Sequence, residues 1–310
     1  MKNGIITIVG APVDSGGAQR GCLMGPDALR VAGLKEALRE QGYEAEDRGN
    51  LRIAGLPDVS HGNPAIHHLA ECAAWIDLLT RSAFEANNRD RIAMFLGGDH
   101  LMSAGTVAGL ALRAREEGRE QFVLWLDAHT DFHNLETTTS GNLHGTPVAY
   151  FTGQPGFGHG FAPVKAAVPP GNILMLGIRS VDPAERVRVI EAGLPIADMR
   201  TIDEEGIARP LSDFLAKVKA ANGRLHVSFD IDFVEPSIAP AVGTTVPGGA
   251  TFREAHLVME MLHDSGLVTS LDIAELNPFM DERGRTARLV VDLIASLFGK
   301  RVMDRLTRSH

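Results

Sequence analysis

Short runs of apolar residues alternate along this chain with longer stretches in which apolar residues recur every three or four positions. The short runs predict parallel strands, because strands that are covered on both faces lose the alternation of apolar and polar residues. The longer stretches predict amphipathic helices, several with Pro, Ser or Thr near the start and Gly or Asn near the end. The expected strands are 5–9, 92–96, 122–126, 173–177, 225–229 and 269–273, and the expected helices are 26–41, 65–86, 103–117, 183–192, 208–220, 252–264 and 284–298.

Repeated strand–helix units predict an α/β fold, a three-layer α/β/α arrangement with a mostly parallel central sheet and right-handed crossovers. The chain has 310 residues, of which 44% are hydrophobic. Because α/β folds of this length often form one unit, we expect a single domain over 1–310. The stretch 147–171 contains several Pro and Gly residues and is expected to be a long surface loop.

Charge and cysteine content indicate which partners and which cellular compartment to expect. The formal net charge is −9, from 39 acidic and 30 basic residues, and the chain has no run of Lys and Arg, which argues against a nucleic-acid partner. Cys22 and Cys72 form no C-x-x-C pair, as expected in a reducing compartment. The apolar run 5–9 is too short for a signal peptide or a membrane span, so we expect a cytoplasmic protein with no membrane partner.

Two short segments, 127–131 and 230–232, carry Asp and His at every second position directly after an apolar run. Residues two apart on an extended chain point to the same side, so each segment can aim its side chains at one point. Four carboxylates gathered in this way would repel one another unless cations neutralised them, which predicts a site for two divalent metal ions. The six candidate ligands are His100, Asp127, His129, Asp131, Asp230 and Asp232.

The same residues lie at or just beyond the ends of expected strands, which is where parallel α/β sheets bind their ligands. A two-metal phosphoesterase could use similar residues. In that class, however, Asp-x-His comes first and Gly-Asp follows, whereas Gly-Gly-Asp-His at 97–100 precedes Asp-x-His here. The order of the motifs therefore disfavours a phosphoesterase.

Five motifs, in this order, resemble the ureohydrolase (arginase/agmatinase) family, and the likeness covers nearly the whole chain. They are Gly-Gly-Asp-His at 97–100, Asp-Ala-His-Thr-Asp at 127–131, Thr-Thr-Thr-Ser-Gly-Asn-Leu-His-Gly at 137–145, Ser-Phe-Asp-Ile-Asp at 228–232 and Asp-Ile-Ala-Glu-Leu-Asn-Pro at 272–278. The third motif resembles the arginase branch of that family. The resemblance implies an arginase-like α/β fold, a homo-oligomer (trimer or hexamer) and two Mn²⁺ per subunit. An oxygen-rich ligand set with two imidazoles and no thiolate suits Mn²⁺ better than Zn²⁺, although zinc, nickel and cobalt stay open.

The activity that the resemblance implies is metal-dependent hydrolysis of the guanidino group of L-arginine to L-ornithine and urea by a metal-bridging hydroxide. One ion would be held by His100, Asp127, Asp131 and Asp230, and the other by His129, Asp127, Asp230 and Asp232. Asp131 would pass a proton from the hydroxide to the departing amine. His144 would shuttle protons and titrate near neutrality, and Glu275 would orient the guanidinium.

Substrate recognition rests, by the same resemblance, on seven residues: His133, Thr138, Ser140, Asn142, Asp182, Thr244 and Glu275. One of these positions departs from the family, because arginases commonly have Asn where this chain has His133. An imidazole can still donate a hydrogen bond to a carboxylate, but its size and charge could change the substrate preference. The alternative is therefore a ureohydrolase that acts on agmatine or 4-guanidinobutyrate. A non-catalytic member of the family should lack at least one metal ligand, and all six are present.

Overall fold

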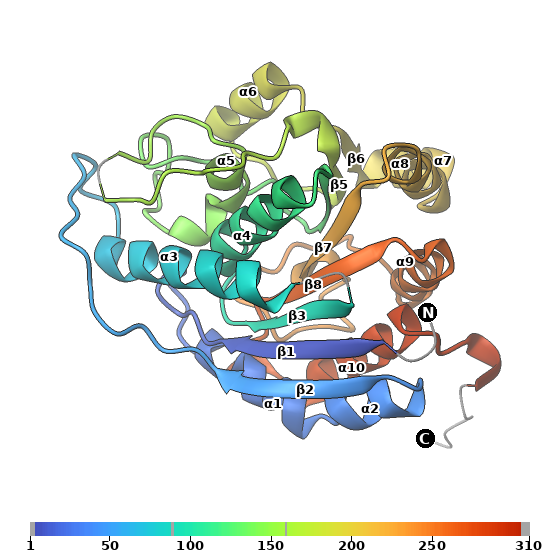
Figure 1. Cartoon of the computed structure of the whole chain (residues 1–310). Coiled ribbons are helices and arrows are strands. Elements are labelled where there is room, and N and C mark those ends of the chain that lie inside the picture. Colours follow the sequence, from blue (N-terminus) through green and yellow to red (C-terminus); the bar gives the residue numbers. More distant parts are fainter. Residues whose placement is uncertain (1–3, 88–89, 159, 305–310) are drawn as a thin grey trace.

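The centre of the computed structural model, which describes residues 4–87, 90–158 and 160–304, is one sheet of eight strands (Figure 1). The strands follow the order β2-β1-β3-β8-β7-β4-β5-β6, and all neighbouring strands are parallel. Their bounds are β1 Ile5–Ala11, β2 Glu44–Asn50, β3 Arg91–Gly97, β4 Gln121–Leu126, β5 Ile173–Ile178, β6 Ile196–Asp198, β7 Arg224–Asp230 and β8 Val268–Ala274.

Helices cover both faces of the sheet, so the expected three-layer α/β/α fold with a parallel sheet is confirmed (Figure 1). One face packs against α3 Leu69–Ala86, α4 Met102–Glu116, α5 Pro147–Phe151 and α6 Pro183–Ala192. The other packs against α1 Gly25–Val31, α2 Leu34–Glu40, α7 Met199–Glu205, α8 Ala208–Ala220, α9 Phe252–Ser265 and α10 Arg285–Leu297.

Strand β4 shows why continuous apolar runs marked the central strands. Its residues Phe122, Leu124 and Leu126 belong to the core under α8 and α9, whereas Val123 and Trp125 belong to the core under α3 and α4. Successive side chains of a strand point to opposite faces. An uninterrupted apolar run therefore supplies two cores at once.

Strands β2 and β6, at the two edges of the sheet, were not predicted. Strand β2 has the sequence Glu-Ala-Glu-Asp-Arg-Gly-Asn, and only Ala45 in it is buried. Strand β6 has three residues. A strand at the edge of a sheet is less covered by helices than a central strand, so it can carry polar residues. Neither segment therefore has the apolar run that predicts a buried strand.

Three expected boundaries are corrected by the structure. The helix expected over 26–41 is two helices, because Gly33 takes a left-handed φ of +94° between α1 and α2. The helix expected from 65 begins at Leu69, after His68 with φ +49°. The stretch 147–171 is not a surface loop throughout, since all five residues of α5, 147–151, are buried. Among the described helices, none has the length and apolar character to cross a membrane.

Candidate metal centre and active site

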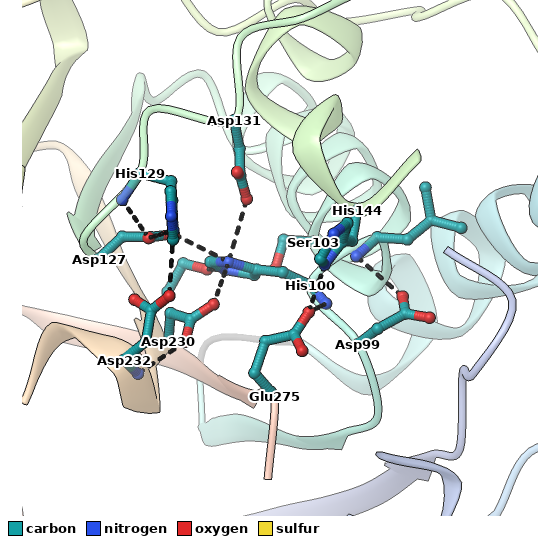
Figure 2. Close-up of polar contacts among 12 residues, drawn as sticks. Asp99, His100, Ser103, Asp127, His129, Asp131, His144, Asp230, Asp232 and Glu275 are labelled. Carbon is teal, nitrogen blue, oxygen red and sulfur yellow. Dashed lines mark hydrogen bonds and ion pairs between the residues drawn. The ribbon is translucent and has the colours of Figure 1, made fainter. Parts of the chain in front are cut away.

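The four central strands, β3, β8, β7 and β4, are neighbours in the sheet, and their carboxyl ends carry the candidate site (Figure 2). Strand β3 leads into Asp99 and His100, β4 into Asp127, β7 ends on Asp230, and β8 leads into Glu275. The six candidate metal ligands, which the sequence separates by more than a hundred residues, lie together there.

Three carboxylates surround the imidazole of His100. Its Nδ1 lies 3.0 Å from Asp127 Oδ2, 3.3 Å from Asp131 Oδ2 and 3.0 Å from Asp230 Oδ2. The ring stacks on Trp125, with centroids 4.1 Å apart, and its Nε2 lies 2.9 Å from Ser228 Oγ. These two contacts fix the orientation of the ring, so that Nδ1 faces the carboxylates.

A second group forms around His129. Its Nδ1 lies 3.0 Å from Asp232 Oδ2 and 3.4 Å from Asp127 Oδ1. The two oxygens of Asp127 therefore face different histidines, as a carboxylate that bridges two ions would. Asp230 differs, because the described contacts join it to His100 alone, through Oδ2, while its Oδ1 accepts the backbone N–H of Asp232 at 2.8 Å. Bridging by Asp230 stays a prediction.

The chemistry of these groups fits divalent cations. His100 Nδ1 and Asp127 Oδ2 are both buried and make no hydrogen bond, although buried polar atoms normally have a partner. Two sets of ligand atoms lie close enough to hold an ion each, His100 with Asp127 and Asp230, and His129 with Asp127 and Asp232. All ligand atoms are carboxylate oxygens and imidazole nitrogens, a set that suits hard or borderline ions such as Mn²⁺.

Several carboxyl groups are buried close together here, and burial together with their mutual repulsion raises the pKa of three of them. Burial and the neighbouring charge of Asp127 raise the pKa of Asp131 to about 7, and burial with carboxylate neighbours also raises the pKa of Asp230 and of Asp232. Burial opposes the charge on His129, yet its bonds to Asp127 and Asp232 raise its pKa to about 12. Cations at this position would relieve the repulsion among the carboxylates.

His144 and Glu275 lie beside the metal ligands as an ion pair, with Nδ1 and Oε1 2.8 Å apart (Figure 2). The same Oε1 accepts the backbone N–H of His100 at 2.8 Å, which ties Glu275 to the loop that carries the first ligand. The pairing with Glu275 bears on the expectation that His144 titrates near neutrality, which stays a prediction. Burial lowers its pKa, but the charge of Glu275 outweighs burial and raises the pKa to about 9.

Two of the predicted catalytic residues have left-handed backbone conformations, with φ +46° at Asp131 and φ +68° at Glu275. Asp adopts this conformation with modest strain, whereas Glu rarely does. The backbone N–H of Glu275 donates to the carbonyl of Gly98 at 2.8 Å, which fixes the residue across the sheet. Strain of this kind is maintained only where the surroundings impose it, and it is common at active sites.

The predicted substrate residues lie on three neighbouring segments. His133 Nε2 lies 3.3 Å from Asp182 Oδ2, and its Nδ1 lies 3.1 Å from Thr137 Oγ1. Thr244 Oγ1 donates to Asp232 Oδ2 at 3.4 Å, so this residue adjoins the second metal group. The contacts with Asp182 and Thr137 fix the orientation of the His133 ring, because they involve both of its nitrogens.

Three further residues, Thr138, Ser140 and Asn142, form one turn. Thr138 is buried, and its Oγ1 accepts the N–H of Gly141 at 3.1 Å, while Ser140 Oγ accepts the N–H of Asn142 at 3.3 Å. Thr138 and Ser140 therefore shape the turn with their hydroxyls. Asn142 directly precedes the short helix η2 Leu143–Gly145, which carries His144.

Sequence reasoning missed a buried polar network behind His100. Ser228 Oγ lies 3.1 Å from Ser103 Oγ, Ser103 donates to Asp272 Oδ2 at 3.0 Å, and His226 Nε2 lies 3.1 Å from the same oxygen. A signal was available, because His226 and Ser228 precede Asp230 at a spacing of two and so share its face of β7. The network supports the ring of His100 from the side opposite the carboxylates.

A cavity of about 630 Å³ lies elsewhere, between α3 and the loops 52–57 and 160–162. It is lined by apolar residues with Arg52, Asp77 and Arg81, and by none of the candidate site residues. The site is therefore identified by its side-chain chemistry and not by cavity size.

Comparison with known proteins agrees with this geometry. A sequence profile of the Arginase family matches residues 5–299. The chain is 62% identical over 300 residues to an arginase of Agrobacterium fabrum, covering 97% of this chain and 92% of that one, and 61% identical over 303 residues to an arginase of Brucella melitensis, covering 98% and 99%. It is similar to the crystal structure of arginase from Bacillus cereus, with a TM-score of 0.86 at 34% identity over 96% of this chain and 99% of that chain. The chain belongs to the arginase family.

Proposed function

We propose that this protein hydrolyses L-arginine to L-ornithine and urea and that it holds two Mn²⁺ per subunit. The observation that carries the proposal is the position of Asp127, whose two oxygens face His100 and His129 while the His144–Glu275 pair lies alongside. The arginases that are 61–62% identical over nearly the full chain support L-arginine as the substrate, ahead of agmatine or 4-guanidinobutyrate.

Two bound divalent cations supply an acidified water and neutralise the carboxylates that hold them. His100, Asp127, Asp131 and Asp230 would hold one ion, and His129, Asp127, Asp230 and Asp232 would hold the other. Asp131 has a second task, which is to transfer a proton. It accepts a proton at its carboxylate during attack on the guanidino carbon and delivers it to the departing amine.

Glu275 binds the planar guanidinium by charge-assisted hydrogen bonds, which orient the reacting carbon. The guanidinium then brings a positive charge close to His144, and a like charge nearby lowers the pKa of an imidazole. The pKa of His144, about 9 in its pair with Glu275, therefore falls toward neutrality when substrate binds. His144 can then release and regain a proton at Nδ1 or Nε2 within one catalytic cycle.

The α-carboxylate and α-amino group of arginine need polar partners of their own. We assign them to His133, Asn142 and Asp182, with Thr138, Ser140 and Thr244 shaping the same region. His133 takes the place of the usual Asn as a donor to the carboxylate, and Asp182 holds its ring in position at 3.3 Å.

The test is urea release by the manganese-loaded protein from L-arginine, agmatine and 4-guanidinobutyrate. Agmatine has no carboxylate, and 4-guanidinobutyrate has no α-amino group. A site built for both groups should reject an analogue that lacks one of them by a factor of up to ~10⁴ in kcat/KM. Higher kcat/KM for agmatine or 4-guanidinobutyrate would contradict the choice of substrate while leaving the reaction class in place. No urea from any of the three would overturn the proposed reaction.

We also propose a homo-oligomer, trimer or hexamer, that works in the cytoplasm without nucleic-acid or membrane partners. The family resemblance supports the oligomer, and the net charge of −9 disfavours nucleic acid. Sedimentation equilibrium of the manganese-loaded protein distinguishes the monomer, trimer and hexamer.

A further inference from the structure

The loop between β1 and α1 crosses the active site and brings a cysteine against Glu275. Cys22 begins the short helix η1 Cys22–Met24 and is 2% exposed. Its Sγ lies 3.7 Å from Glu275 Oε2, which is hydrogen-bonding distance for sulfur. The two residues are 253 positions apart, so nothing in the local sequence around either indicates the contact.

The backbone on both sides of Cys22 is fixed. Asp14 Oδ1 accepts the N–H of Gly21 at 3.0 Å and that of Leu23 at 3.3 Å. Asn277, two residues after Glu275, donates from Nδ2 to the carbonyl of Arg20 at 3.0 Å. Gly21 has φ +131°, and a Cβ there would lie 2.2 Å from Asn277 Oδ1, so the loop packs directly on the segment that carries Glu275.

The two oxygens of Glu275 have different partners. Oε1 lies 2.8 Å from both the N–H of His100 and Nδ1 of His144. Cys22 is the hydrogen-bonding partner that the described contacts give to Oε2. Burial and nearby carboxylates raise the pKa of the Cys22 thiol, so it keeps its proton and can donate it, whereas ionised Glu275 can only accept.

We propose that Cys22 is a positioning residue for Glu275, donating its S–H to Oε2 and fixing the plane in which the carboxylate meets the guanidinium. The terminal torsion of Glu is broad, so contacts at Oε1 alone leave the carboxylate free to rotate, and a contact at each oxygen defines its plane. A thiol is a weak donor, so it holds Oε2 and still lets that oxygen accept a stronger hydrogen bond from the guanidinium. The inference rests on the proposed role of Glu275 in binding that group.

The test uses Cys22→Val, which keeps a similar volume without a donor, and Cys22→Ser, which keeps a donor. In the manganese-loaded protein, we expect Cys22→Val to lower kcat/KM for arginine about tenfold and to raise the inhibition constant of guanidinium chloride by a similar factor. Bound manganese should be unchanged. Cys22→Ser should return both constants to within about threefold of wild type.

Cys72 supplies the matched control, because it is also buried and its Sγ donates to the carbonyl of Ser15 at 3.4 Å. Cys72→Val and Cys72→Ser should change the melting temperature but leave guanidinium inhibition within about twofold. If Cys22→Val does not fold, Cys22→Ala takes its place, with the same expected shift. Wild-type constants in a folded donor-less variant, or equal impairment of Cys22→Ser and Cys22→Val, would overturn the role of Cys22. Absence of arginine hydrolysis in the wild type would instead contradict the proposed function.

Discussion

His100 is held by two contacts to its ring and one to its backbone. Trp125 stacks against it, Ser228 contacts Nε2, and the backbone N–H of His100 donates to Glu275. Such outer contacts set the orientation and basicity of a metal-binding histidine. The backbone contact also joins His100 to Glu275, the residue proposed to bind the guanidinium. A substitution that moves either residue should therefore shift the other.

Asp127 should be the most sensitive ligand, since its two oxygens serve both histidines. Asp127→Asn keeps the shape but removes the charge and one oxygen, and we expect the protein to hold fewer than two ions per subunit. Activity should fall by more than about 100-fold, because changes in outer contacts alone cost 10–100-fold. Metal analysis and urea release are the measurements. The control Asp203→Asn, at an exposed position on α7, should retain both ions and full activity.

His133→Asn tests the residue that departs from the family pattern. If His133 serves as a hydrogen-bond donor, Asn should substitute for it, and kcat/KM for arginine should stay within about tenfold of wild type or improve. His133→Ala removes the donor and should lower the same constant by roughly 1–3 kcal/mol of transition-state stabilisation. The measurement is kcat/KM of each variant with arginine and with agmatine. A gain for agmatine in His133→Asn would assign His133 to substrate choice instead.

At the level of helices and strands, the sequence predicted the six central strands and missed the two edge strands and the short buried helix α5. All six expected strands exist, because each contributes buried apolar residues to the core, while the polar edge strand β2 carries no such pattern. The clustering of the candidate metal ligands was predictable from their spacing at the strand ends. Cys22 was not, because its partner Glu275 approaches it through the pairing of β1, β3 and β8 and not through any local pattern.

Helix α9 offers a test of stability that is independent of catalysis. Thr251 and Glu254 form a capping box, in which Glu254 N–H donates to Thr251 Oγ1 at 3.3 Å and Thr251 N–H donates to Glu254 Oε2 at 2.8 Å. Thr251→Ala should lower the free energy of unfolding by about 1 kcal/mol. Thr251→Ser keeps the hydroxyl and should cost less. Urea denaturation measures both, and a loss of kcat/KM in Thr251→Ala would show that α9 matters to the site.

For the whole molecule, metal binding and protons should compete. The pKa of Asp131 is raised to about 7, so the metal-free protein takes up a proton on this carboxylate as the pH falls through 7, and the pKa values of Asp230 and Asp232 are also raised by burial and neighbouring carboxylates. Ions must displace those protons, so affinity should rise with pH. We expect Mn²⁺ to bind at least about tenfold more tightly at pH 8 than at pH 6, as measured by calorimetry.

Treatment with a chelator should abolish activity, and Mn²⁺ should restore it best among divalent ions. The melting temperature should fall on metal removal, because ligands that bind only the folded state stabilise it. Full activity of the metal-free protein, or equal Mn²⁺ affinity at pH 6 and pH 8, would count against the assignment of the acidic cluster.

The strand order has a consequence for how the protein is made. Strands β7 and β8 are inserted between β3 and β4, so the two strands that carry His100 and Asp127 have no neighbour between them until residues 224–274 leave the ribosome. During that interval, the nascent chain exposes unpaired apolar strand edges, which are prone to aggregation. Contacts between such distant residues also form slowly. The candidate metal site can therefore form only after β7 and β8 have been made, and a product truncated before β7 would retain His100, Asp127, His129 and Asp131 but lack Asp230 and Asp232.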